Sequence, residues 1–442
     1  MTPADYSYVA IQWGIWRAGG IAVPLATSHP PAEWEYVLRD ATPDVVVVAP
    51  SFAEALVPVA KHVGVKVLES SVALQGPNPG TLPAGTPERR AMMLYTSGTT
   101  GRPKGVVATH ANLISQVTCL HDAWGWAPDD RILLVLPLHH LHGIVNVLTC
   151  ALWAGAVCEI LPAFDADAVW DRLASGQLTL FMAVPTIYHK LIAAWDSAPA
   201  ERQRVLSAGS SRLRLMVSGS AALPVRTLER WRSITGHTLL ERYGMTEIGM
   251  ALSNPLHGMR RPGFVGVPLP GIKVRLVDEG GRDVPAGTPG EILVQGGGVF
   301  LEYWGRPEET RAAFREGWFC TGDVAVLEDG GYRILGRSSV DLIKTGGYKV
   351  SALEIEEVLR SHPEILECAV VGVADDEWGQ QVAAAVELRG GGSLELEELK
   401  EWAKQRLAPY KVPRSLRVVS ALPRNAMGKV VKSDVASLFR EC

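Results

Sequence analysis

The sequence feature that most constrains this chain is a loop rich in glycine and hydroxyl side chains. It runs from Tyr95 to Val106, reads YTSGTTGRPKGV, and follows an apolar run, Ala91 to Leu94, that we expect to end a buried strand. Glycines allow tight turns and close approach of the backbone to a ligand. Backbone N–H groups, short hydroxyls and one ammonium are the groups that a polyphosphate needs.

An ordinary surface loop has no need of a lysine between proline and glycine, as in Pro103-Lys104-Gly105. The order of residues also differs from a Walker A loop, in which glycine precedes the lysine and a hydroxyl residue follows it. We therefore predict a phosphate-binding loop of another kind. Its candidate contact residues are Thr96, Ser97, Gly98, Thr99, Thr100 and Lys104.

The composition is that of a globular protein that binds small molecules. A chain of 442 residues is long enough for two or three domains with cores of their own. Charged residues make up 20% and apolar residues 47%, which is ordinary for a globular chain. The net charge of −4 gives no reason to expect nucleic acid or an anionic membrane as a partner.

Cysteine spacing and the first residues bear on the compartment. The six cysteines form no CxxC pair, so neither a zinc site nor a disulfide framework is indicated. The chain begins MTPAD, without the basic region of a signal peptide, and we expect a cytoplasmic protein. The segment 132–158 has no Lys, Arg, Asp or Glu but contains Pro137 and three histidines, which favours a strand, a loop and a buried helix over a membrane span.

The pattern of strands and helices predicts an α/β fold. Up to about Gly236, short β-branched runs such as 44–48 and 213–217 alternate with helical segments, which favours a layered domain with mostly parallel strands. From Gly263 to Gly336 short strands separated by Gly and Pro indicate a small β subdomain. From Ser351 onward a compact α+β domain follows. We predict a large N-terminal domain over 1–338 and a small, mobile C-terminal domain over 339–442.

Further motifs follow the phosphate loop along the chain. They read PLHHLHG at 137–143, SGSAALP at 218–224, RYGMTE at 242–247, WFCTGD at 318–323 and PRNAMGK at 423–429. Together they resemble the signature of the adenylate-forming superfamily, which includes acyl-CoA synthetases, amino-acid adenylation domains and luciferases. The resemblance covers nearly the whole chain, although the strand–helix units that open the family fold are absent before Gln12.

The resemblance implies roles for individual residues. Tyr243 would stack on adenine, Thr246 would bond the α-phosphate and Asp323 would accept hydrogen bonds from the ribose hydroxyls. A carboxylate suits a hard divalent ion, and Glu247 would bind Mg²⁺. The implied catalytic residues are Lys429, Thr246, Glu247 and His140. Besides the phosphate loop, the implied ATP or AMP contacts are Gly219, Ser220, Ala221, Tyr243, Gly244, Asp323 and Arg337.

The histidine cluster at 139–142 has two readings. Three histidines without Cys or a carboxylate are weak evidence for a metal, and packing is the simpler explanation for each. The family pattern implies that His140 is the aromatic gate between the acyl pocket and the thiol tunnel. Amino-acid-activating relatives carry an Asp in this motif, and its absence here favours a plain carboxylic acid.

A hinge and a CoA loop are implied between the two domains. Arg337 resembles an arginine that contacts ribose or phosphate beside the hinge. The next acidic residue, Asp341, lies four positions after it rather than two or three, so Ser339 or Val340 occupies the pivot. The loop IKTGGYKV at 343–350 resembles the one that lines the CoA tunnel, and it offers Gly346, Gly347 and Lys349.

The runs around 241–271 and 337–354 look most similar to malonyl-CoA synthetases, which share the displaced Asp. This implies an ATP-dependent acid–CoA ligase that joins malonate or methylmalonate to coenzyme A. A second carboxylate buried in an acyl pocket needs a cation. Arg is the expected partner because its planar fork can bind a carboxylate bidentately. We take Arg260 as the first candidate and Arg261 as the second, both before Pro262-Gly263.

Two other functions stay open on the sequence. One is a CoA ligase for short- or medium-chain fatty acids or aryl acids. The other is a nucleotide-binding protein without turnover, because a missing first subdomain could impair folding or the acyl pocket. The same missing units would leave Trp13, Trp16 and Leu25 on an exposed apolar face, which predicts possible self-association.

Overall fold

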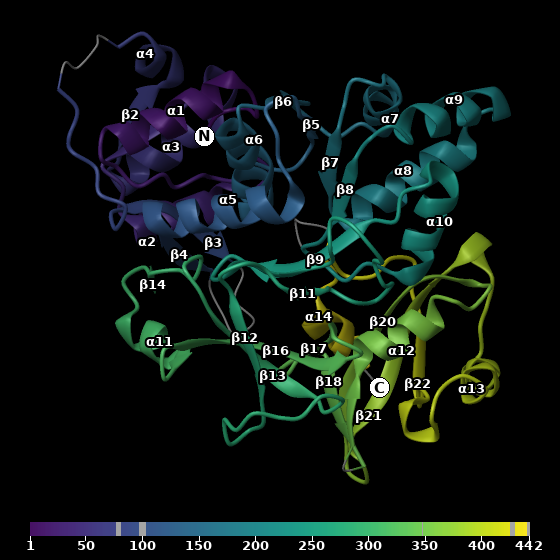
Figure 1. The fold of residues 1–442 in the computed structure, drawn as a ribbon. Coiled ribbons are helices and arrows are strands. Elements are labelled where there is room, and N and C mark those ends of the chain that lie inside the picture. The colour runs from purple at the N-terminus through teal and green to yellow at the C-terminus, as the bar shows by residue number, and fades with distance from the viewer. Residues whose placement is uncertain (77–80, 97–102, 347, 425–428, 440–442) are drawn as a thin grey trace.

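The computed structural model describes residues 1–442 except 77–80, 97–102, 347, 425–428, 440–442 and the side chain of Lys349. Figure 1 shows helices gathered around β5–β9 in the upper half, and β12, β13, β16 and the C-terminal elements in the lower half. The combination of a parallel sheet with surrounding helices confirms the predicted α/β class.

A seven-stranded sheet forms the centre of the large domain, in the order β11-β10-β9-β8-β7-β5-β6. Its strands are β5 (Arg131–Leu134), β6 (Val157–Ile160), β7 (Leu180–Ala183), β8 (Leu215–Ser218), β9 (Leu240–Met245), β10 (Gly249–Ser253) and β11 (Val267–Pro268). β5 to β9 pair in parallel, and β10 and β11 are antiparallel additions. β7 and β8 are buried at every position because helices cover both faces of a parallel sheet.

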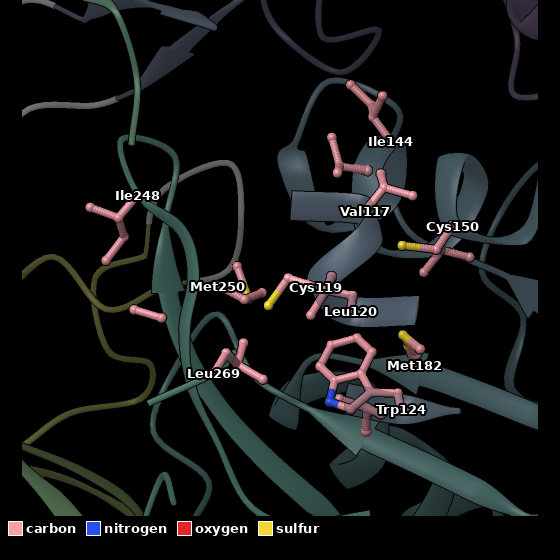
Figure 2. Packing of buried hydrophobic residues seen from close by; sticks show 14 of the residues in the cluster. Val117, Cys119, Leu120, Trp124, Ile144, Cys150, Met182, Ile248, Met250 and Leu269 are labelled. Atoms are coloured by element: carbon pink, nitrogen blue, oxygen red, sulfur yellow. The ribbon is translucent and has the colours of Figure 1, made fainter. Parts of the chain in front are cut away.

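Helices α5 to α10 surround this sheet. They are α5 (His110–Trp124), α6 (Cys150–Ala154), α7 (Ala166–Ala174), α8 (Pro185–Ser197), α9 (Ala200–Ser210) and α10 (Val225–Thr235). α5 starts at His110 because Thr109 and Asn112 form a capping box there. Figure 2 shows its apolar face, with Val117, Leu120 and Trp124, against Met182 of β7 and Met250 of β10.

The N-terminal part contains two small sheets. β1 (Val45–Val48) pairs in parallel with β2 (Lys66–Glu69), and β3 (Arg90–Thr96) pairs with β4 (Lys104–Thr109) and, through it, with β14 (Glu302–Tyr303). The helices here are α1 (Tyr6–Arg17), α2 (Pro31–Ala41), α3 (Pro50–Val63) and α4 (Ser70–Leu74). The turn between β3 and β4 is the phosphate loop, most of which lies outside the described residues.

The predicted β subdomain is a five-stranded antiparallel sheet. It contains β12 (Lys273–Val277), β13 (Gly290–Gln295), β15 (Phe314–Arg315), β16 (Trp318–Glu328) and β17 (Gly331–Arg337), with α11 (Pro307–Ala312) beside it. The long strand β16 carries Asp323 near its middle, opposite Arg337 at the end of β17.

The C-terminal part has its own sheet and its own core. The strands are β18 (Leu342–Thr345), β19 (Tyr348–Ser351), β20 (Ile365–Asp375), β21 (Gly379–Leu388) and β22 (Ser415–Val418). The helices are α12 (Ala352–Leu359), α13 (Leu396–Lys404) and α14 (Lys432–Ser437), with 3₁₀ turns η2 (Arg389–Gly391) and η3 (Pro409–Lys411). The predicted division at 338/339 falls between β17, which pairs with β16, and β18, which pairs with β19 and β21.

The charge-free segment 132–158 is a strand, a loop and a buried helix, as predicted. β5 is followed by the π-helix η1 (His142–Thr149), which continues into α6 and then β6. Among the described residues, no helix is both long enough and apolar enough to span a membrane.

Candidate active site

The RYGMTE motif forms the turn between β9 and β10 and holds a buried carboxylate. Glu247 is 6% exposed and accepts a 3.0 Å hydrogen bond from the hydroxyl of Tyr303. Burial raises the pKa of Glu247. Gly244 cannot be replaced at this turn, because a Cβ there would lie 2.1 Å from the carbonyl oxygen of Gly249. Thr246 is half-buried in the same turn.

Asp323 joins two of the predicted nucleotide residues. Its Oδ2 accepts a 2.6 Å hydrogen bond from the hydroxyl of Tyr243, and its Oδ1 accepts a 3.0 Å bond from Nε of Arg337. The pairing of β16 with β17 places Asp323 and Arg337 opposite each other. The charges of Arg337 and Asp323 also act on Glu247, so the predicted ribose and metal ligands belong to one site.

The loop from Gly219 to Ala221 covers a buried arginine. A Cβ on Gly219 would lie 2.6 Å from Nε of Arg242, so only glycine fits here. Ser220 has a left-handed φ of 68°, which is strained for a non-glycine residue, and its Oγ lies 3.2 Å from Nδ1 of His142. Ala221 is exposed.

Arg242 is the functional candidate that the sequence analysis missed. It is 3% exposed, its Nη2 donates a long 3.4 Å bond to Ser220 Oγ, and its Nε has no partner among the described residues. Burial lowers the pKa of Arg242 to about 9, which still leaves it charged at neutral pH. Burial raises the pKa of its neighbour Glu241 to about 8, so at neutral pH that carboxyl supplies little negative charge.

His140 lies in a row of imidazoles next to this cluster. Its ring centroid is 4.0 Å from that of His139, which is in edge contact with His29 at 5.7 Å. Burial, followed by the charge of Lys429, lowers the pKa of His140 to about 4. Burial and the neighbouring His140 lower the pKa of His139 to about 3. Both rings are therefore neutral near pH 7.

Lys429 reaches this cluster from the C-terminal domain. The residue is solvent-exposed, yet many protein atoms crowd its ammonium. This crowding, and then the positive charges of Arg337 and Arg242, lower its pKa, while Asp323 raises it. The structure thus brings the C-terminal lysine beside residues from β9, β16 and β17.

The structure describes only the two ends of the predicted phosphate loop. Thr96 and Lys104 face each other as the pair that closes β3 and β4. The ammonium of Lys104 pairs with Glu309 at 2.5 Å and lies 5.0 Å above the ring of Tyr303. Tyr303 also bonds Glu247, which connects the loop to the metal candidate. Ser97, Gly98, Thr99 and Thr100 lie outside the described residues.

The two arginines chosen from the sequence are engaged elsewhere. The guanidinium of Arg260 donates to the carbonyls of Pro255, Thr238 and Leu256 at 3.1, 2.7 and 2.7 Å. Arg261 stacks on the ring of Phe264 at 3.7 Å and pairs with Asp329. Because these contacts fix a surface loop, the structure favours a scaffold role for both. Of the two arginines whose charges act on Lys429, Arg337 pairs with Asp323, and Arg242 has no carboxylate partner among the described residues.

Aromatic and cationic side chains surround the predicted CoA loop. A Cβ on Gly346 would lie 2.7 Å from the indole of Trp378, and the guanidinium of Arg414 lies 3.8 Å from the centroid of that ring. Tyr348 stacks on Tyr410 with centroids 4.3 Å apart and an angle of 7°. Gly347 and the side chain of Lys349 lie outside the described residues.

The protein side chains alone do not make a metal cage. No group of three or more His, Cys, Asp or Glu side chains converges within the part of the chain that the structure describes. Glu247 offers the hard oxygen that Mg²⁺ prefers, and Mg²⁺ commonly takes its other ligands from phosphate and water. The site therefore fits a Mg²⁺ that arrives with a nucleotide.

Known proteins resemble this chain over nearly its full length. It is 51% identical over 464 residues to the bovine (Bos taurus) protein malonate–CoA ligase ACSF3, mitochondrial, with 98% of this chain and 79% of that protein covered. The ATP-bound structure of MatB from Rhodopseudomonas palustris matches with a TM-score of 0.92 at 36% identity, covering 100% of this chain and 88% of that one.

A second structure, of a malonyl-CoA ligase, matches with a lower score. The malonyl-CoA ligase ternary product complex with methylmalonyl-CoA and AMP matches with a TM-score of 0.69 at 37% identity, covering 95% of this chain and 89% of that one.

The relatives contradict the expected cytoplasmic location. The bovine relative is mitochondrial by name, which points to mitochondria instead. The physical reason for the error is that free thiols argue against an oxidising compartment but do not separate one reducing compartment from another. All five cysteines among the described residues are free.

Two family models match the chain, one after the other. Residues 1–304 match the AMP-binding enzyme family, and residues 354–429 match its C-terminal domain. With this match over more than half of its length, the chain belongs to the AMP-binding enzyme family.

Proposed function

We propose that this protein is an AMP-forming malonate–CoA ligase. The observation that carries the choice of malonate is Arg242, a buried guanidinium with an unpartnered Nε in the same cluster as Lys429. A buried cation without a compensating charge is costly unless an anion pairs with it. The names of the relatives, which include malonate–CoA ligases at 51% identity, support the same reaction.

The position of Arg242 fits the second carboxylate of malonate. The two carboxylates of malonate are separated by one methylene, so their charges must be bound within a few ångström of each other. The charge of Lys429 acts on both Arg242 and His140 through the crowded site, and Ser220 adds a hydroxyl next to the guanidinium. An uncharged acyl chain would leave Arg242 unpaired.

In the first half-reaction the malonate carboxylate attacks the α-phosphorus of ATP, forming malonyl-adenylate and releasing pyrophosphate. A carboxylate is a weak nucleophile and ATP is anionic, so catalysis consists mainly of alignment and charge neutralisation. Lys429 and the phosphate loop from Thr96 to Lys104 supply positive charge and hydrogen bonds. Thr246 would bond the α-phosphate, and Asp323 and Tyr243 would hold the nucleoside.

Glu247 would hold Mg²⁺, which when bound supplies further positive charge for the phosphate oxygens. The contact from Tyr303 orients this carboxylate, and the same ring lies under Lys104. One aromatic side chain therefore fixes the distance between the proposed metal ligand and the phosphate loop.

In the second half-reaction the thiolate of CoA attacks the adenylate carbonyl and AMP leaves. Lys429 would block that approach, so we propose that residues 339–442 rotate about 338–341 as one domain and present Gly346 and Gly347 instead. The surface beside Gly346, with Tyr348, Tyr410, Lys411, Trp378 and Arg414, offers ring faces and cations. These are the groups that bind a base and the phosphates of the CoA nucleotide.

We also propose that the protein self-associates through α1. Tyr6 and Trp13 on this helix are 79% and 45% exposed, whereas Trp16 donates its indole N–H to the carbonyl of Ala91 and Leu25 packs against the cluster around Trp34. The apolar face is thus smaller than expected. Sedimentation at increasing concentration tests this: a monomer at all concentrations would contradict it.

The test of the proposed function is pyrophosphate release with ATP and a panel of acids. Malonate and methylmalonate should exceed butyrate and benzoate in kcat/KM, and adding CoA should convert the product to the thioester. A preference for butyrate or benzoate would exclude malonate as the substrate. Nucleotide binding without pyrophosphate release from any acid would exclude ligase activity.

A further inference from the structure

A carboxylate of the C-terminal domain caps a helix of the large domain. The backbone N–H of Val225, the first residue of α10, donates a 3.0 Å hydrogen bond to Oε1 of Glu357 on α12. These residues are 132 positions apart. The helix has no side-chain cap of its own, because Pro224 stands at the N-cap position. A helix N-terminus carries unpaired N–H groups and a partial positive charge, and both favour a carboxylate.

This bond lies next to the proposed active site. α10 follows directly on the loop that contains Gly219 and Ser220. The N–H of Leu223, two residues before Val225, donates to Oε1 of Glu241, the neighbour of Arg242. The segment that receives Glu357 therefore continues directly from the Gly219–Ala221 loop and also contacts Glu241, the neighbour of the buried Arg242.

Most other charges around the Glu357–Val225 contact form pairs of the same sign. Burial raises the pKa of Glu357. The charge of Arg360 and the hydrogen bond from the Val225 N–H lower this pKa, and the negative charges of Glu229 on α10 and Glu356 raise it further. Burial and the like charge of Arg226 on α10 lower the pKa of Arg389 in the C-terminal domain. The hydrogen bond between Glu357 and Val225 is thus surrounded by pairs of like charge. It can hold the C-terminal domain in one orientation, and the repulsion between those pairs favours its release.

We infer that Glu357 is a positioning residue for the adenylation half-reaction. By capping α10 it would fix the C-terminal domain in the orientation in which Lys429 reaches the site. Glu357 travels with that domain, so the rotation for thioester formation would break the bond. This inference rests on the proposed function, although it requires only that the enzyme activates some acid.

Three variants and one control test the inference. Glu357→Ala removes the acceptor, and Glu357→Gln keeps an oxygen that can accept the same bond. Val225→Pro removes the donor from the other side; proline is favoured at the first position of a helix, so α10 should still form. The control is Glu401→Gln, which alters an exposed carboxylate of the C-terminal domain whose partner, Lys404, lies on the same helix, α13.

Each variant is assayed in both half-reactions, with melting temperature as a check on folding. Acid-dependent pyrophosphate release measures the first, and thioester formation from supplied acyl-adenylate and CoA measures the second. Glu357→Ala and Val225→Pro should each lower pyrophosphate release about tenfold, as expected for a hydrogen bond to a charged group. Thioester formation should stay within about twofold, and Glu357→Gln should recover most of the loss.

The double variant separates this role from general damage. If Glu357 acts through Val225, combining Glu357→Ala with Val225→Pro should lower the rate no further than either change alone. Equal loss in both half-reactions, full additivity, or wild-type pyrophosphate release in Val225→Pro would overturn the inference. Wild-type enzyme that activates no acid at all would instead refute the proposed function.

Discussion

The guanidinium of Arg242 and the backbone of Gly219 are in direct contact, so that a Cβ on Gly219 would lie 2.6 Å from Nε of Arg242. One residue belongs to β9 and the other to the loop before α10. Because residue 219 has no side chain, the guanidinium of Arg242 can pack against the backbone of the Gly219–Ala221 loop. Arginine and loop therefore form one structural unit.

The first prediction concerns the acid that is bound. Arg242→Met should reduce kcat/KM for malonate by about ten- to more than a hundredfold, since a hydrogen bond to a charged group contributes roughly 1.5–3 kcal/mol. Activity on butyrate should stay level or rise, because the variant replaces a buried charge with an apolar chain. Steady-state kinetics with both acids measure the ratio.

Arg260→Met is the matched control. Arg260 donates to two carbonyls of its own loop and to that of Thr238 before β9, so its loss should lower the melting temperature and affect both acids alike. Were malonate activity to fall selectively in Arg260→Met and not in Arg242→Met, the assignment of the carboxylate partner would be reversed.

The second prediction separates the two half-reactions at Lys429. Lys429→Ala should lose acid-dependent pyrophosphate release by orders of magnitude, because its charge acts where the adenylate forms. Thioester formation from supplied malonyl-adenylate should persist. Loss of both reactions to the same extent would refute the alternating positions of the C-terminal domain.

The third prediction is a pH dependence of stability that originates at Glu241. Its pKa is raised from 4.5 to about 8, so the folded protein holds this proton more tightly than the unfolded chain. Its contribution to stability is full below pH 4.5 and is lost as the pH rises from 4.5 to about 8, by about 1.4 kcal/mol per pKa unit.

Glu241→Gln resembles the protonated carboxyl at every pH. Its melting temperature relative to wild type should therefore rise between pH 5 and pH 8, whereas the exposed control Glu401→Gln should show no such trend. A difference that is constant across this range would mean that Glu241 does not bind its proton in the folded protein.

The fourth prediction concerns the CoA surface. Tyr410→Ala removes the ring that stacks on Tyr348 and should raise KM for CoA about tenfold or more, the scale of one base–aromatic contact. Pyrophosphate release without CoA should not change. Arg406→Ala, which breaks the 4.2 Å contact with Trp402 elsewhere in the same domain, should leave KM for CoA unaltered.

The sequence alone predicted the elements whose chemistry is local. The β-branched and apolar run at 213–217 predicted a strand, which is β8, and the alternation of strands with helices predicted the mostly parallel sheet. The motifs likewise identified Tyr243, Glu247, Asp323 and Lys429, because each stands in a short pattern that resembles a family signature. Roles assigned to these residues remain predictions.

Arg242 and Glu357 could not be found in the same way, because their importance depends on distant neighbours. Glu241 and Arg242 are consecutive in β9 and so point to opposite faces of the sheet, and both are buried. Two consecutive charged residues in a strand of a parallel sheet were the available signal, since helices cover both faces of such a sheet. From the sequence, Arg260 was equally suitable as the partner of the second carboxylate. Only the fold shows that its guanidinium already donates hydrogen bonds to backbone carbonyls.

The pairing of Asp323 with Arg337 across β16 and β17 has a consequence for the order of events. Both residues lie on the large-domain side of 338–341, so a rotation that starts there would leave their grip on the nucleoside unchanged. AMP would then be retained while pyrophosphate departs and CoA enters. The contacts of AMP with β16 and β17, rather than the rotation of the C-terminal domain, would then determine when AMP leaves.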